Sequence, residues 1–154
     1  MDTERYNVLL VDDDQAQVEL ARCAIAESCP EIELTIVGGG DAVLDWFSAS
    51  ARKNERKPDL ILLDLKLPKL EGLAVLRKLR SHAAASEIPI VVFSAEHTQA
   101  DVQMSYRAGA NSFLAKPASL AEFTECFRER LAYWMNPGQR EQNLSTPNTA
   151  ADQV

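Results

Sequence analysis

Five short apolar segments, rich in β-branched residues, alternate along the chain with segments whose apolar residues recur at helical spacing. The apolar segments are Tyr6–Val11, Ile32–Val37, Leu60–Leu63, Ile90–Phe93 and Ser112–Ala115. The first, third and fourth are almost continuously apolar, which is typical of strands covered on both faces of a parallel sheet. A strand–helix unit repeated five times predicts right-handed crossovers. We therefore expect an α/β fold, a doubly wound, five-stranded parallel sheet in one domain over residues 5–135.

Two of the helical segments show a clear buried face. After the third strand an apolar residue recurs every third position, at Leu70, Leu73, Leu76 and Leu79. The last segment repeats at spacings of three and four, at Leu120, Phe123, Phe127, Leu131 and Trp134. The chain that follows is polar and aperiodic, and it predicts a disordered tail over residues 136–154. Such a tail is too short for a second domain, so we expect no output domain.

Composition excludes several classes of function. The 154 residues include 16 Lys+Arg against 23 Asp+Glu, a net charge of −7, which argues against a nucleic-acid binder. No stretch approaches the roughly 20 apolar residues that span a bilayer, so no membrane association is expected. The N-terminus does not resemble a signal peptide, and the three cysteines show no pairing pattern. These features together predict a cytoplasmic protein with reduced thiols.

Charged or hydroxyl side chains follow four of the five predicted strands at their carboxyl ends. They are Asp12, Asp13 and Asp14 after the first strand, Asp64 after the third, Ser94 after the fourth and Lys116 after the fifth. In a doubly wound sheet, ligands bind at the carboxyl ends of the strands. We therefore expect these side chains to gather at one edge of the sheet.

The charges at this edge predict a metal ion. Carboxylates about 5 Å apart repel each other by a few kcal/mol per pair at an effective dielectric near 20. The single ammonium of Lys116 cannot balance three of them, whereas Mg²⁺ suits a site with few carboxylates and several waters. Such a site neutralises phosphoryl oxygens, and a carboxylate there can form an aspartyl phosphate.

Four separated motifs carry a resemblance to a known family. They are DD at 12–13, LLDLKLPKLEG at 62–72, SA at 94–95 and FLAKP at 113–117. In order and spacing they resemble the receiver domain of two-component response regulators, over about residues 5–134. The resemblance implies a flavodoxin-like fold that accepts a phosphoryl group from a histidine kinase.

The resemblance also implies roles for individual residues. Asp64 is then the phosphoacceptor, and Asp12 and Asp13 hold Mg²⁺ together with the Asp64 carboxylate and the Lys66 backbone carbonyl. The phosphoryl oxygens are met by Lys116 and by the Ala95 backbone amide. Ser94 is the switch hydroxyl, Phe113 is the switch aromatic, and the peptide bond before Pro117 is commonly cis in the family. Asp14 falls at a variable position, and we expect it to cap a helix.

A narrower resemblance lies in DLKLPKLEG at 64–72, SYRAGANSF at 105–113 and YWM at 133–135. With no output domain expected, these segments resemble the single-domain regulators that partner phytochrome-type histidine kinases. The implied partners are such a kinase or a phosphotransfer protein. The predicted readout surface, for partner binding or a homodimer, is formed by the fourth helix, fifth strand and fifth helix. It would include Val102, Tyr106 and Tyr133, for which ordinary partly buried packing is the alternative interpretation.

Other interpretations of the same residues remain. A degenerate receiver-like module would bind partners without being phosphorylated. An aspartyl-phosphate phosphatase would usually carry a second aspartate two residues after the nucleophile, where this chain has Lys66. The glycines at 38–40 do not complete a dinucleotide motif, because Val43 stands where the third glycine is needed. His82 and His97 are interpreted as surface residues rather than phosphohistidines.

Overall fold

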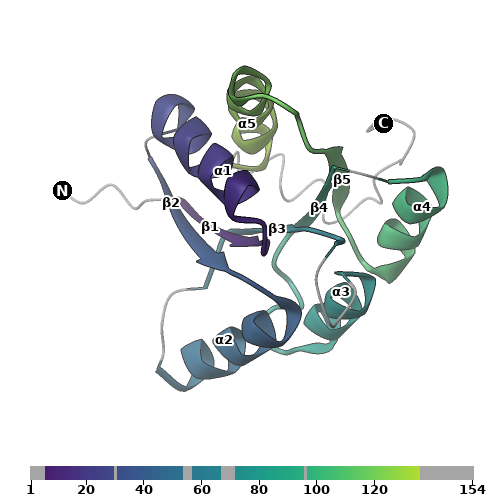
Figure 1. The fold of residues 1–154 in the computed structure, drawn as a ribbon. Helices are drawn as coiled ribbons and strands as arrows, with labels where there is room; N and C mark the ends of the chain where they lie inside the picture. Colours follow the sequence, from purple (N-terminus) through teal and green to yellow (C-terminus); the bar gives the residue numbers. More distant parts are fainter. Residues whose placement is uncertain (1–5, 30, 54–56, 67–71, 96, 136–154) are drawn as a thin grey trace.

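The computed structural model describes residues 6–29, 31–53, 57–66, 72–95 and 97–135 (Figure 1). They form one five-stranded parallel sheet in the order β2-β1-β3-β4-β5. The strands are β1 Tyr6–Val11, β2 Ile32–Val37, β3 Leu60–Leu63, β4 Ile90–Ser94 and β5 Ser112–Ala115. The predicted strands and the doubly wound α/β fold are confirmed, and β4 extends one residue further, to Ser94. The predicted tail over 136–154 and Leu70 lie outside the described residues.

Five helices cover the two faces of the sheet. They are α1 Gln15–Ser28, α2 Gly40–Lys53, α3 Gly72–Ser81, α4 Gln99–Ala108 and α5 Leu120–Met135. Figure 1 shows α1 and α5 on one face, with α2, α3 and α4 on the other. Along β1, Val8 and Leu10 pack toward α1 and α5, while Leu9 and Val11 pack toward the other helices. This alternation follows from the period of two in a strand, and it explains why the central strands are apolar throughout.

The predicted buried faces of α3 and α5 are confirmed. In α5 the side chains of Phe123, Phe127, Leu131 and Trp134 are buried, and Leu120 is half-buried. In α3, Leu76 and Leu79 are buried and Leu73 packs at the edge of the same core. No helix among the described residues is both long and apolar enough to cross a bilayer.

Arg80 links three segments at the edge of the sheet opposite the strand carboxyl ends. Its guanidinium donates to the Gly109 carbonyl at 2.8 Å, to the Ile88 carbonyl at 2.7 Å and to Asn111 Oδ1 at 2.5 Å. Burial lowers the pKa of this guanidinium below its usual value. Gly109 has φ of +115° and its α-carbon lies so close to Arg80 that a Cβ would fall 2.6 Å from Arg80 Cγ. Arg80 therefore holds the end of α3 against the turn that follows α4.

Candidate functional site

Three carboxylates meet at the carboxyl ends of β1 and β3. Asp12, Asp13 and Asp64 each offer one oxygen, and these oxygens lie within 4.8 Å of one another. The pairing of β1 with β3 produces this arrangement, because Val11 lies opposite Leu63 and the aspartates come directly after them. Asp12 and Asp64 are buried and Asp13 is exposed. The predicted gathering of carboxylates at one edge of the sheet is confirmed.

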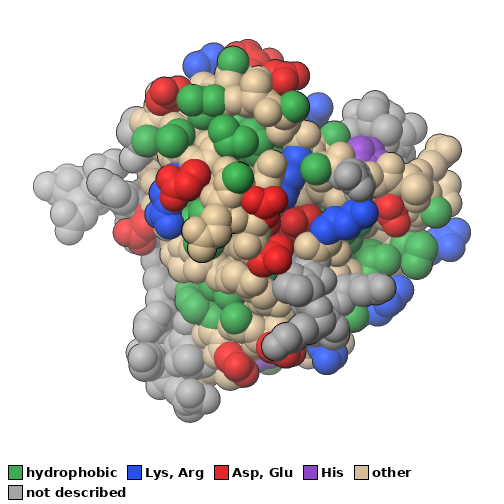
Figure 2. Space-filling model, in the orientation of Figure 1, with side chains coloured by type: hydrophobic (Ala, Val, Ile, Leu, Met, Phe, Trp, Pro, Cys, Tyr) green, Lys and Arg blue, Asp and Glu red, His purple; other side chains and the backbone are tan. Residues whose placement is uncertain are grey.

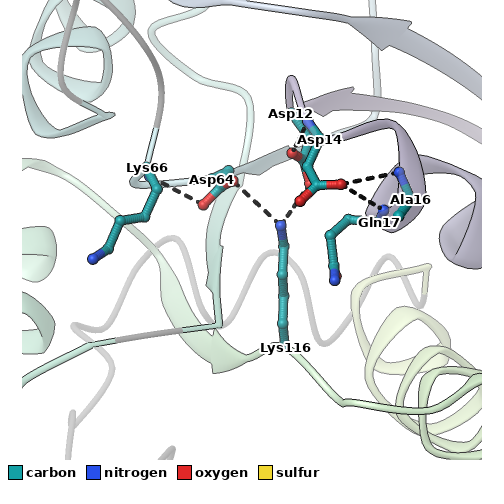
Figure 3. Close-up of polar contacts among 7 residues, drawn as sticks. All are labelled: Asp12, Asp14, Ala16, Gln17, Asp64, Lys66 and Lys116. Carbon is teal, nitrogen blue, oxygen red and sulfur yellow. Dashed lines mark hydrogen bonds and ion pairs between the residues drawn. The ribbon is translucent and has the colours of Figure 1, made fainter.

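Lys116 reaches this cluster from the end of β5 (Figure 3). Its Nζ lies 2.6 Å from Asp12 Oδ2 and 3.3 Å from Asp64 Oδ2, and all three side chains are buried. The Lys116 backbone N–H donates to the Ser94 carbonyl at 2.9 Å, which fixes the end of β5 against β4. The peptide bond from Lys116 to Pro117 is trans, so the cis bond that is common in the resembled family is not observed here. The lysine thus supplies one positive charge to two buried acids.

Asp64 is held by its own loop. Its Oδ1 accepts a hydrogen bond from the Lys66 backbone N–H at 3.0 Å. Burial raises the pKa of Asp64 above its ordinary value, although the Lys66 N–H and the Lys116 ammonium favour the charged form, and Asp12 raises it further. Removal of this carboxyl from water therefore outweighs its favourable contacts in setting its pKa.

A cavity of about 390 Å³ opens beside these groups. Its lining includes Asp13, Asp64, Lys116, Lys66 and Ala95. Figure 2 shows acidic side chains next to basic ones in the middle of this face of the molecule. Mg²⁺ binds oxygen ligands and keeps several waters, so carboxylate oxygens within reach of one another beside a polar cavity suit it. The residues present fit that ion.

Two further residues, Asp14 and Gly72, fix the backbone next to the carboxylates. Asp14 caps α1, as predicted, because its Oδ1 accepts hydrogen bonds from the Ala16 and Gln17 N–H groups at 2.9 and 3.2 Å. Sequence reasoning did not single out Gly72, although it is the last residue of the motif LLDLKLPKLEG at 62–72. Its N–H donates to the Leu65 carbonyl at 3.0 Å, and a Cβ there would lie 2.5 Å from Leu65 Cα. Only glycine therefore lets α3 begin against the backbone that follows Asp64.

The predicted switch residues lie next to the cavity and behind it. Ser94 is fully buried at the end of β4, and Ala95 lines the cavity. Phe113 is 1% exposed, on the face of β5 that packs toward α4. His97 is half-buried against Phe113, and His82 is half-buried against Phe47, so both predicted surface residues are partly covered by the core. Each sits where a helix or loop folds back over the core, which spacing along the chain does not reveal.

The predicted readout surface needs one correction. Val102 is 2% exposed and belongs to the core beneath α4, so it does not present a side chain to a partner. The reason is that α4 turns this face toward β5. Tyr106 is half-buried beside the same core, while Tyr133 is 39% exposed. Met104 of α4, which sequence reasoning did not select, is 41% exposed.

The Asp13→Asn variant should be more stable than the wild type without metal. Removing one exposed carboxylate relieves its repulsion with Asp12 and Asp64, and we expect the melting temperature in EDTA to rise by about 2 °C or more. The matched control is Asp14→Asn, which removes a neighbouring charge and keeps the helix cap; its change should be smaller. A lower melting temperature of Asp13→Asn in EDTA would contradict the crowding of charge.

The sequence matches one family model, the response regulator receiver domain, over residues 8–128. It is 31% identical over 129 residues to the response regulator Rcp1 of Synechocystis sp. (strain ATCC 27184 / PCC 6803 / Kazusa), covering 83% of this chain and 88% of Rcp1. It is 34% identical over 131 residues to the DNA-binding response regulator MtrA of Mycobacterium tuberculosis (strain ATCC 25618 / H37Rv), covering 85% of this chain. The chain spans about half the length of MtrA, 53%.

Solved structures show the same fold. The phosphorylated cyanobacterial phytochrome response regulator RcpA superposes with a TM-score of 0.77 at 30% identity, covering 86% of this chain and 95% of RcpA. The Mn²⁺-bound form of Rcp1 superposes with a TM-score of 0.73 at 30% identity, covering 86% of this chain and 96% of that one.

Proposed function

This chain belongs to the response regulator receiver domain family, and from that membership we propose that it takes a phosphoryl group from a histidine kinase onto Asp64. One observation carries the proposal. Asp12, Asp13 and Asp64 meet within 4.8 Å, and the Lys116 ammonium contacts two of them beside an open cavity. A degenerate receiver would have lost one of these groups, and none is missing.

We assign the metal to the carboxylates. Asp12, Asp13 and Asp64, with the Lys66 backbone carbonyl, would hold Mg²⁺, which supplies positive charge to the phosphoryl oxygens. Rcp1, a protein similar to this one, has been solved with Mn²⁺ bound, and RcpA has been solved phosphorylated. Both support the assignment without placing an ion in this chain.

The chemistry of the step belongs to Asp64. A carboxylate oxygen attacks the phosphorus of the donor phosphohistidine, an O–P bond forms, and the P–N bond breaks with its electron pair going to the imidazole nitrogen. The Lys66 N–H holds Oδ1 in place, which leaves Oδ2 facing the Lys116 ammonium at 3.3 Å. Lys116 is therefore positioned to pair with phosphoryl oxygens once they arrive. The protein accepts the group rather than acting as a phosphatase.

The readout follows from the residues behind the cavity. Ser94 and the Ala95 backbone amide would contact the phosphoryl group, and the packing around Phe113 would shift between two states of the same fold. The surface that includes Tyr106 and Tyr133 would then change its affinity for a partner or for a second copy of the chain. The proposed donor is a phytochrome-type histidine kinase or a phosphotransfer protein, and the proposed location is the cytoplasm.

Acetyl phosphate tests the proposal directly. Incubation with acetyl phosphate and Mg²⁺ should add the mass of one phosphoryl group to the intact protein, and EDTA should prevent the addition. Hydroxylamine should remove the label, because it cleaves acyl phosphates and leaves phosphoserine intact. A label that forms equally in EDTA, or that resists hydroxylamine, would contradict an aspartyl phosphate.

A further inference from the structure

His97 lies in the short segment between β4 and α4, close to both the cavity and the readout helix. Two residues before it, Ala95 lines the cavity beside Asp64. One residue after it, Thr98 caps α4, where its Oγ1 accepts a hydrogen bond from the Asp101 N–H at 3.1 Å and its own N–H donates to Asp101 Oδ2 at 2.8 Å. A displacement of Ala95 therefore has a covalent path of three residues to the first turn of α4.

The imidazole of His97 packs against the buried ring of Phe113. The two ring centroids are 4.9 Å apart, with an interplanar angle of 61°. Phe113 lies on β5 opposite Val92 of β4, on the strand that ends next to Lys116. The ring contact thus joins the segment after β4 to the strand that carries the cavity's lysine. If His97 moves, Phe113 loses a packing partner on the side facing α4.

The hydrogen bonding of His97 differs from that of His82, the other histidine. His82 also packs against a buried phenylalanine, Phe47, at 6.0 Å. Its Nδ1 accepts a hydrogen bond from the Ala84 N–H at 3.1 Å, and its Nε2 lies 3.4 Å from Ser48 Oγ. The Nδ1 of His97 is buried with no hydrogen-bond partner among the residues that the structure describes.

A buried nitrogen without a partner carries a free-energy cost, which calls for an explanation in a folded protein. His82 is held by both ring nitrogens, as a purely structural residue would be. His97 is held by its ring contact with Phe113 rather than by a hydrogen bond to Nδ1. The segment between β4 and α4 is therefore tied to β5 through a ring contact, which a substitution can remove or keep.

We propose that His97 is the positioning residue through which occupancy of the Asp64 cavity is transmitted to Phe113 and α4. The inference rests on the proposed function, since it takes a phosphoryl group on Asp64 as the input. Contacts of that group with Ser94 and Ala95 displace the segment, His97 moves with it, and the packing of Phe113 against α4 changes. The ring contact transmits the change, and the chemistry at Asp64 does not use His97.

Beryllofluoride with Mg²⁺ serves as the probe, because it stands in for the phosphoryl group and its bound fluorides are counted by ¹⁹F NMR. Hydrogen–deuterium exchange then reports α4 and β5. In the wild type we expect beryllofluoride to change exchange in α4 by at least about fivefold, the low end of typical coupling between sites. In His97→Ala, ¹⁹F signals of bound probe should persist while less than half of the α4 response remains. His97→Phe keeps a ring against Phe113 and should restore the response.

His82→Ala is the matched control, because it removes the same imidazole from a comparable aromatic contact away from the cavity. It should bind the probe and respond in α4 as the wild type does. A full α4 response in a folded His97→Ala would overturn the inference. Loss of bound fluoride in that variant would overturn it too. So would a wild type that binds the probe without any change of exchange in α4. Absence of bound fluoride in the wild type would instead contradict the proposed function.

Discussion

Labelling by acetyl phosphate should fall by at least about a thousandfold when Asp64 is replaced with asparagine, because loss of a nucleophile removes the chemical step itself. The amide oxygen of the new side chain still accepts the Lys66 N–H, so the loop keeps its conformation. The amide is uncharged and does not attack phosphorus. The Asp64→Asn variant should therefore fold as the wild type does and simply fail to react, as intact mass after incubation will show.

Asp59→Asn is the matched control for this experiment. Asp59 precedes β3, whereas Asp64 follows it, so the two variants lose the same charge at opposite ends of one strand. Asp59 Oδ2 accepts the Asn7 N–H at 2.9 Å, and an asparagine oxygen keeps that acceptor. Labelling of Asp59→Asn should equal that of the wild type. Undiminished labelling of Asp64→Asn would show that another residue accepts the group.

Lys116→Ala should produce the second large effect, in stability as well as in signalling. Its ammonium contacts the buried Asp12 and Asp64, and removing one partner of a buried ion pair typically costs about 3–5 kcal/mol. We expect a loss of that order in EDTA at neutral pH. Mg²⁺ should still bind and recover part of it, because the ion neutralises the same carboxylates. Denaturant unfolding with and without Mg²⁺ measures both effects.

The stability lost in Lys116→Ala should depend on pH through the pKa of Asp64. Lys116 favours the charged form of Asp64 and so lowers its pKa, against the larger effect of burial. The stability that Lys116 contributes is present where Asp64 is ionised in the folded protein, above its raised pKa, and it is lost as pH falls through that pKa and this carboxyl becomes protonated. Wild type and Lys116→Ala should therefore converge in acid and differ most at neutral pH.

Lys66→Ala provides the comparison for Lys116→Ala. Lys66 lines the same cavity, but its side chain is exposed, and its contact with Asp64 comes from the backbone. Its replacement should change stability little, because exposed ion pairs contribute little. Equal losses from the two lysines would mean that net charge, rather than the buried contacts of Lys116, governs the site. If the Lys116→Ala variant responds to beryllofluoride as the wild type does, Lys116 has no role in the switch.

The strands and the carboxylate cluster could be predicted from sequence because their signals are local. Apolar runs such as Leu60–Leu63 are bounded by polar residues, and parallel pairing then brings the residues after each strand to one edge. Asp14 was predicted as a helix cap for the same reason, since a cap depends on its immediate neighbours.

What sequence reasoning missed depends on tertiary packing. The spacing of Val102 and Tyr106 defines one side of α4, but it does not say whether that side faces β5 or solvent. The contact between His97 and Phe113 depends on the path of the segment after β4, which no periodicity records. Gly72 is needed because of a backbone approach to Leu65, which appears only once α3 is placed.

The Arg80 contacts have a consequence for how α4 can move. They fasten the turn after this helix, at Gly109 and Asn111, to the end of α3 and to the chain before β4. The opposite end begins at Thr98, next to the segment that borders the cavity. Because the Arg80 contacts restrain the turn at Gly109, we expect any displacement of α4 to be larger at Thr98 than near Gly109. If a phosphoryl group on Asp64 shifts α4 as we propose, these contacts predict the larger displacement at the end of α4 that lies next to the cavity.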